Sequence, residues 1–164
     1  MHQEIKHIRI DGRLIHGQVV TKWIFVTKVD RIIVVDDEIL NNPLEKNALK
    51  MSTPSNVKLS ILGVESAVRN INNRKYKDQK VMVLTKTPRQ LRMLAENGLE
   101  MKKINVGNIS QREGSIQVRP SVFLKEEDIV DLSTLIKMGV DVTTQMVPAD
   151  LEEKMENILE KIKG

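Results

Sequence analysis

The stretch IRIDGRLIHGQVVTKW, residues 8–23, decides the fold of this chain, because it contains a strand, a turn and the start of a helix in direct succession. The short apolar run Ile8 to Ile10 predicts the strand, and Gly12 predicts the turn. The helical spacing of the next apolar residues predicts a helix that buries one face, carrying Val19, Val20, Trp23 and Ile24. A strand that turns directly into a helix is the first half of a strand–helix–strand unit.

Five further β-rich apolar runs follow, at residues 31–35, 57–62, 80–85, 103–106 and 140–147. The stretches between them carry helix signals, and parallel strands need connections of roughly a dozen residues. We therefore expect an α/β fold, a doubly wound, mostly parallel open sheet of about six to seven strands with helices on both faces and the first strand central. Because composition shows no linker-like shift, residues 1–164 are expected to form one domain.

Four helices have recognisable signals. Asn42, Pro43 and Glu45 predict a capped start for a helix that runs to Met51. Thr87, Pro88 and Gln90 repeat this device for a helix that ends near Gly98. Two amphipathic helices are expected at 125–138 and near the C-terminus, the second burying Leu151, Met155, Ile158, Leu159 and Ile162. Residues 107–120 are expected to be a loop region with a short strand at 116–118.

Composition excludes several classes of protein. The chain has no Cys, which excludes disulfide scaffolds, Cys-ligated zinc and thiol catalysis. No apolar run is long enough to span a membrane, and the charged N-terminus does not resemble a signal peptide, so a cytoplasmic protein is expected. The net charge of +4 favours anionic partners. Only Trp23, Phe25, Tyr76 and Phe123 are aromatic, which argues against stacking of nucleic-acid bases.

The turn after the first strand has the residue types of an anion site. His16 is expected at or just before a helix N-terminus, where free backbone N–H groups of Gly17 and Gln18 and the helix dipole favour a phosphoryl group. Arg13 can bind two oxygens of such a group with its planar guanidinium. The same dipole disfavours imidazolium, which leaves a ring nitrogen free to attack, and Asp11 is a candidate to orient His16 or Arg13. The simpler alternative is that His16 only caps the helix and Arg13 pairs with Asp11.

Ligands of an open α/β sheet bind at the carboxyl ends of its strands. Secondary candidates at those ends are Asp36, Asp37, Lys86, Gly107 and Asn108, for which ordinary turn chemistry is the simpler interpretation. Asp36 and Asp37 could suggest the magnesium site of a receiver domain, but no Asp ends the third predicted strand. We expect them to anchor loops and to help hold Arg13. No metal site is expected, since His2 and His7 lack partners at metal-ligand spacing.

Several segments together resemble one known family. RIDGRLIHGQVVTKW, VVDDEI, KLSIL, INVGNIS and GVDVTTQMVP are similar to the IIB component of the mannose/fructose/sorbose family of the bacterial sugar phosphotransferase system. The resemblance runs from about Lys6 to Leu159. It implies that His16 accepts a phosphoryl group, on Nδ1, from a phosphohistidine of a IIA component and passes it to a sugar carried by the membrane components IIC and IID. Gly12 departs from the family, which commonly has an acidic residue there.

The resemblance further implies no cofactor, no metal, no nucleic acid partner, and membrane association only through the partner components. It does not identify the sugar. Two alternatives from other classes stay open at this point. One is a non-catalytic basic domain that binds polyanions, and the other is a receiver-like signalling domain that uses Asp36 and Asp37.

Overall fold

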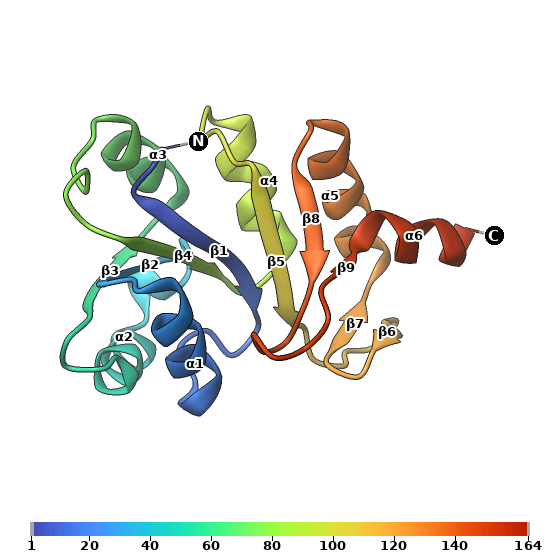
Figure 1. Cartoon of the computed structure of the whole chain (residues 1–164), viewed down its shortest axis with the longest axis horizontal. Coiled ribbons are helices and arrows are strands. Elements are labelled where there is room, and N and C mark those ends of the chain that lie inside the picture. Colours follow the sequence, from blue (N-terminus) through green and yellow to red (C-terminus); the bar gives the residue numbers. More distant parts are fainter. Residues whose placement is uncertain (1, 164) are drawn as a thin grey trace.

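A computed structural model describes residues 2–163 and shows a twisted sheet with helices on both faces (Figure 1). The sheet has seven strands in the order β3-β2-β4-β1-β5-β8-β9, so the first strand is the middle one, as predicted. All pairs are parallel except β8 with β9. The strands are β1 Ile5–Asp11, β2 Arg31–Val35, β3 Lys58–Leu62, β4 Val81–Thr85, β5 Lys103–Asn108, β8 Asp141–Thr144 and β9 Glu153–Lys154.

Helices connect the parallel strands, and a small hairpin follows β5. The helices are α1 Gly17–Thr27, α2 Pro43–Ser52, α3 Val64–Asn72, α4 Pro88–Glu96, α5 Glu126–Lys137 and α6 Met155–Lys163, with a short 3-10 turn η1 at Ile39–Asn41. The hairpin consists of β6 Ile116–Arg119 and β7 Val122–Leu124, paired antiparallel. The doubly wound α/β prediction is therefore confirmed.

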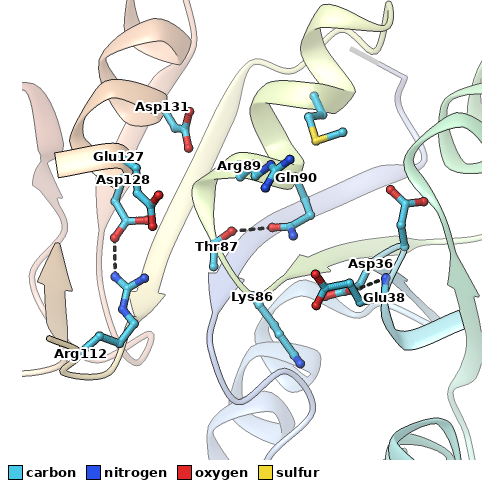
Figure 2. A pocket seen from close by; sticks show the side chains of 12 residues that line it. Asp36, Glu38, Lys86, Thr87, Arg89, Gln90, Arg112, Glu127, Asp128 and Asp131 are labelled. Carbon is cyan, nitrogen blue, oxygen red and sulfur yellow. Dashed lines mark hydrogen bonds and ion pairs between the residues drawn. The ribbon is translucent and has the colours of Figure 1, made fainter. Parts of the chain in front are cut away.

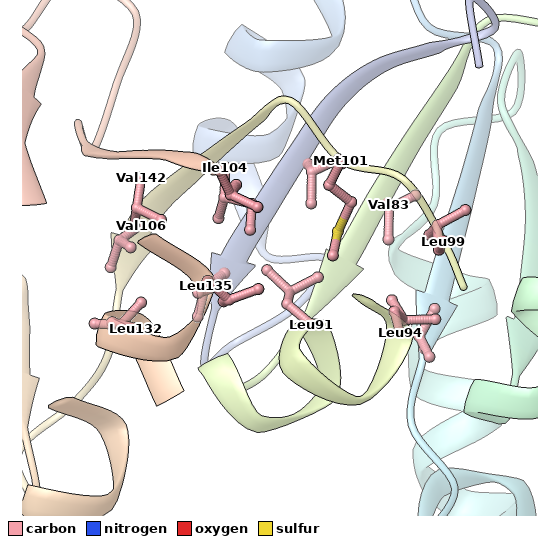
Figure 3. Packing of buried hydrophobic residues seen from close by; sticks show 14 of the residues in the cluster. Val83, Leu91, Leu94, Leu99, Met101, Ile104, Val106, Leu132, Leu135 and Val142 are labelled. Carbon is pink, nitrogen blue, oxygen red and sulfur yellow. The ribbon is translucent and has the colours of Figure 1, made fainter. Parts of the chain in front are cut away.

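Two apolar cores lie on opposite faces of the sheet, and the alternation of side chains along each strand produces them. In β2, Ile33 and Val35 join the core beneath α3, α4 and α5, whereas Ile32 and Val34 join the core beneath α1 and α2. Figure 3 shows the first core, where leucines of α4 and α5 pack onto β4, β5 and β8. Both helix layers thus bury an apolar stripe, which is what the periodicity of their sequences requires.

Strand β1, at the centre of the sheet, has only one apolar face. Ile8 and Ile10 enter the core beneath α3 to α5, while the opposite face carries His7, Arg9 and Asp11. This polar face lies beneath α1, where the Trp23 ring stacks on His7 at a centroid distance of 4.4 Å. Arg9 is buried there with 1% of its surface exposed. A charged side chain in the middle of a central strand needs partners, and these are described with the site.

At the end of β1, the chain crosses to a different face of the sheet from the one used by the strands on either side of it. After β1 the chain crosses on the α1 face, whereas after the adjacent strands β4 and β5 it continues to α4 and α5 on the other face. Such a reversal opens a crevice at the carboxyl ends of the strands. Residues 12–16 therefore lie where ligands of this kind of fold bind (Figure 1).

Some predicted boundaries are wrong, each for a local reason. The last predicted strand ends at Thr144 instead of residue 147, because the carbonyl groups of the next residues bind side chains. The last helix begins at Met155, and Leu151 is 90% exposed ahead of it. Ile162, also predicted on the buried face, is 37% exposed. Of the apolar face predicted for α1, Val20 and Trp23 are buried, while Val19 and Ile24 are only partly buried.

Two predicted helix starts behave differently. The Asn42 side chain accepts a hydrogen bond from the Glu45 amide at 3.1 Å, as expected of a cap. Thr87 makes no such bond, because its hydroxyl donates to the Gln90 side chain at 2.7 Å. The predicted strand at 116–118 exists, but as part of the separate β6-β7 hairpin. Within residues 2–163, no helix combines the length and the apolar character needed to cross a membrane.

Burial of His7 generates a prediction about stability. Burial, with a further contribution from the Arg9 charge, lowers the pKa of His7 from 6.5 to about 3. As the pH is lowered from 6.5 to about 3, the unfolded chain binds a proton at His7 that the folded chain does not bind. The free energy of unfolding therefore decreases as the pH is lowered through this range. At pH 5 this amounts to roughly 2 kcal/mol. Between pH 7 and pH 5, urea unfolding of His7→Gln should show a loss of unfolding free energy that is smaller than that of the native chain by this amount.

The matched control is His2→Gln, since His2 lies outside the sheet and bonds to Asn72. Its loss of stability, measured in parallel, shows what replacement of a histidine outside the sheet does to the urea transition. An equal loss in His7→Gln and in the native chain would contradict the prediction.

Candidate functional site

The loop after β1 is held in place by two apolar side chains and two backbone hydrogen bonds. Leu14 and Ile15 are buried in the core beneath α1 and α2. The Gly12 amide donates to the Asn108 carbonyl at 2.8 Å, and the Leu14 amide donates to the Asp11 carbonyl at 2.9 Å. These contacts fix the loop to the ends of β1 and β5.

The left-handed positions of this loop are Leu14, at φ 56°, and Gly17, at φ 52°. Gly12, the residue from which the turn was predicted, has no positive φ. A left-handed leucine is unfavourable on its own, and burial of its side chain compensates for that cost. Gly17 adopts this conformation readily because it has no Cβ.

His16 is the N-cap residue of α1 and is exposed to solvent. Its side chain makes no capping hydrogen bond, so the first half of the simpler alternative does not describe this structure, whereas the second half, a pair between Arg13 and Asp11, is present. The first turn of α1 contains no acidic side chain that would compete for the helix N-terminus. Gly17 and Gln18 follow at this exposed N-terminus. The imidazole is therefore accessible at a position that favours anions.

Asp11 binds Arg13 rather than His16. Its Oδ1 accepts from the Arg13 backbone amide at 3.0 Å and from Arg13 Nε at 3.4 Å. Among the described residues nothing hydrogen-bonds to the His16 ring, so the expected orientation of His16 by Asp11 is not observed. Arg13 Nη2 is buried but has no hydrogen-bond partner in the described part of the chain. A guanidinium with an unpaired nitrogen, three residues before an exposed imidazole in the same loop, is suited to bind an anion.

Behind Asp11 lies Arg9, which the sequence analysis did not select. Arg9 Nη2 donates to Asp11 Oδ2 at 3.2 Å and to the Met146 carbonyl at 2.9 Å. Its Nη1 donates to Asn105 Oδ1 at 2.5 Å and to the Gln145 carbonyl at 3.2 Å. Burial lowers the pKa of Arg9, and the Asp11 carboxylate opposes this effect. Arg9 thus connects β1 with β5 and with the segment after β8.

Gly107, predicted as a rim residue with a turn or supporting role, makes space for Arg9. A Cβ at position 107 would lie 2.0–2.2 Å from the guanidinium atoms, which is not possible. The Trp23 ring covers Arg9 at 5.4 Å, and Trp23 Nε1 donates to the Met146 carbonyl at 3.0 Å. A period-two reading of β1, which places Arg9 between His7 and Asp11 on one face, could have indicated this cluster.

The other predicted rim residues have separate partners. Asp36 accepts hydrogen bonds from the amides of Glu38 and Ile39, and Asp37 accepts one from the Val64 amide. Both carboxylates anchor loops, as expected, but neither holds Arg13, whose carboxylate partner is Asp11. Asn108 contributes its carbonyl to Gly12.

Lys86 pairs with Glu45 of α2 at 2.6 Å. It also lies at the rim of a cavity of about 340 Å³ at the same end of the sheet. Figure 2 shows acidic side chains of α5 in this cavity, with Arg112 bound to Asp128. His16 and Arg13 do not line it. The cavity is therefore separate from the anion site. No cluster of acidic and histidine side chains in residues 2–163 is arranged to hold a metal ion.

Comparison with known proteins relates this geometry to a family. The family model described as "PTS system sorbose subfamily IIB component" matches residues 5–164. The mannose-specific EIIAB component of Escherichia coli K12 is 37% identical over 154 residues, which are 94% of this chain and 48% of that protein. The chain thus spans about half the length of that relative.

Other relatives are matched over nearly their whole length. The fructose-specific EIIB component of Bacillus subtilis is 35% identical over 94% of each chain. The crystal structure of the IIBSor domain of the sorbose permease from Klebsiella pneumoniae superposes with a TM-score of 0.91 at 30% identity and 96% coverage of both chains. On this evidence, the chain belongs to the sorbose-subfamily IIB components of the sugar phosphotransferase system.

Proposed function

We propose that this chain is a phosphocarrier in which His16 accepts a phosphoryl group from the phosphohistidine of a IIA component and transfers it to a sugar. The sugar is held by membrane components IIC and IID, and the chain acts at the cytoplasmic side as a single domain, associating with the membrane through these partners. The observation that carries the proposal is the exposed His16 ring at the α1 N-terminus, three residues after Arg13, whose Nη2 has no partner among the described residues. Family membership supports it.

In the first step, a lone pair of the His16 imidazole attacks the phosphorus atom, and the phosphorus–nitrogen bond to the donor histidine breaks. The donor ring nitrogen keeps the bonding electrons. In the second step, a sugar hydroxyl oxygen attacks the phosphorus atom and the bond to His16 breaks. The His16 ring nitrogen keeps the bonding electrons, and the hydroxyl proton passes to water. Because the phosphohistidine is already an activated donor, neither ATP nor a metal ion is required. The protein contributes mainly position and charge.

Specific groups supply these contributions. The Arg13 side chain is 31% exposed and its guanidinium can bind equatorial phosphoryl oxygens, while Asp11 holds the same guanidinium at Nε. The backbone amides of Gly17 and Gln18 at the start of α1 add partial positive charge. His16 is exposed, which an acceptor that must meet a second protein requires.

The proposal predicts the result of a labelling experiment. Phosphate is followed from phosphoenolpyruvate through the general phosphotransferase proteins and a mannose-family IIA component. The native chain should acquire acid-labile, alkali-stable label, His16→Ala should acquire none, and Arg13→Ala should be labelled about 100-fold more slowly. Arg89→Ala is the matched control, because Arg89 is an exposed arginine at the same end of the sheet that lines only the neighbouring cavity.

Other outcomes identify the alternatives. Normal labelling of His16→Ala would exclude His16 as acceptor. Alkali-labile label would indicate an acyl phosphate, as in a receiver domain. If no IIA component labels the native chain, but it binds polyanions with a steep salt dependence that His16→Ala does not change, it is a polyanion-binding domain.

The net charge of +4 generates a second prediction. A basic carrier is attracted to an acidic IIA surface, and salt screens this attraction between exposed charges. Transfer at limiting IIA concentration should therefore slow as ionic strength rises from about 0.01 to 0.5 M. The transfer rate is measured after rapid mixing of phosphorylated IIA with this chain. A rate independent of salt would show that electrostatic steering plays no part in the encounter.

A further inference from the structure

We infer that Arg9 is a positioning residue for phosphoryl transfer, which sets the orientation of Arg13 through the shared carboxylate of Asp11. This inference rests on the proposed function. Arg9 is almost fully buried on β1, the middle strand of the sheet, and no hydrogen bond joins it to residues 12–16. Its effect on the reaction would therefore be transmitted entirely by its neighbours.

The two oxygens of Asp11 divide their contacts between two arginines. Oδ2 faces inward and accepts from Arg9 Nη2, whereas Oδ1 faces the loop and accepts from the amide and Nε of Arg13. The Asp11 side chain is 3% exposed, so water competes little for either oxygen. Because Asp11 binds Nε, the Nη2 end of Arg13 stays unpaired. A rotation of the carboxylate would therefore move the guanidinium that is proposed to bind the phosphoryl group.

Arg9 is itself held rigidly. Three further acceptors bind its guanidinium: the Asn105 side chain and the carbonyls of Gln145 and Met146. Trp23 covers it from α1, and Gly107 leaves the space that it fills. Rigidity of this kind is required of a group that must hold a reacting constellation within a fraction of an ångström.

Stability alone does not account for this arrangement. Buried ion pairs contribute little net free energy, since desolvation offsets their attraction, and apolar residues of similar volume often serve as well. A lysine would preserve the charge, but it could not bind Asp11 and two carbonyl groups with the planar geometry of a guanidinium. The network therefore fits a requirement for geometry at Asp11 better than a requirement for stability.

A double-mutant cycle tests the inference. Transfer rates from phosphorylated IIA are measured for Arg9→Lys, for Arg13→Ala and for the double variant. If Arg9 acts through Arg13, Arg9→Lys should lower the transfer rate about tenfold when it is made in the native chain. The same substitution made in Arg13→Ala should change the transfer rate less than about twofold. Arg31→Lys is the matched control, because Arg31 is a partly buried arginine that bonds to Gln79 and Ser60 outside the site. It should leave the rate unchanged.

Thermal unfolding shows whether Arg9→Lys is folded. If it is not, a second variant tests the inference. Asp11→Asn keeps the shape of the side chain but weakens both ion pairs, and it should show the same lack of additivity with Arg13→Ala. Equal slowing in both backgrounds, or no slowing by a folded Arg9→Lys, would overturn the inference while leaving the carrier function intact. Absence of label on the native chain would overturn the carrier function, and the inference with it.

Discussion

The burial of one guanidinium constrains much of this structure. Arg9 is buried on the α1 face of the central strand, and a charge in that position must be fully paired. Position 107 on β5 therefore carries no Cβ, and the carbonyl groups after β8 turn toward Arg9 instead of extending the strand. Trp23 closes the cluster from α1 and binds the same segment.

The elements that could be predicted are those specified by local sequence. Apolar runs located the parallel strands of the sheet, and the Asn42 cap located α2, because alternation and capping depend on residues only a few positions apart. The alternation along β1 places Arg9 on one face with His7 and Asp11, but it does not identify the partners Asn105 and Gln145, which are 96 and 136 positions away. The premature end of β8 was missed for the same reason.

The site shows the same division. The position of His16 at the start of α1 follows from a strand, a turn and a helix in succession, and the structure has it there. The sequence did not decide whether Asp11 binds His16 or Arg13. That choice depends on the path of the loop, which is set by the left-handed backbone of Leu14, and the core that buries Leu14 imposes this conformation. Asp37 depends likewise on the Val64 amide, 27 positions away, whereas the amides that Asp36 binds are two and three positions along the chain.

Exposure and precision make opposing demands on a carrier of the proposed kind. A histidine that must meet a donor protein and then an acceptor cannot lie in a deep pocket, so surrounding walls cannot orient the groups that react there. The reacting groups must instead be oriented by side chains that join the exposed loop to the rigid sheet. In this chain Asp11 forms that connection, with one oxygen facing the loop and the other facing the interior. A buried charge beneath an exposed reactive loop is therefore a physical solution to both demands at once.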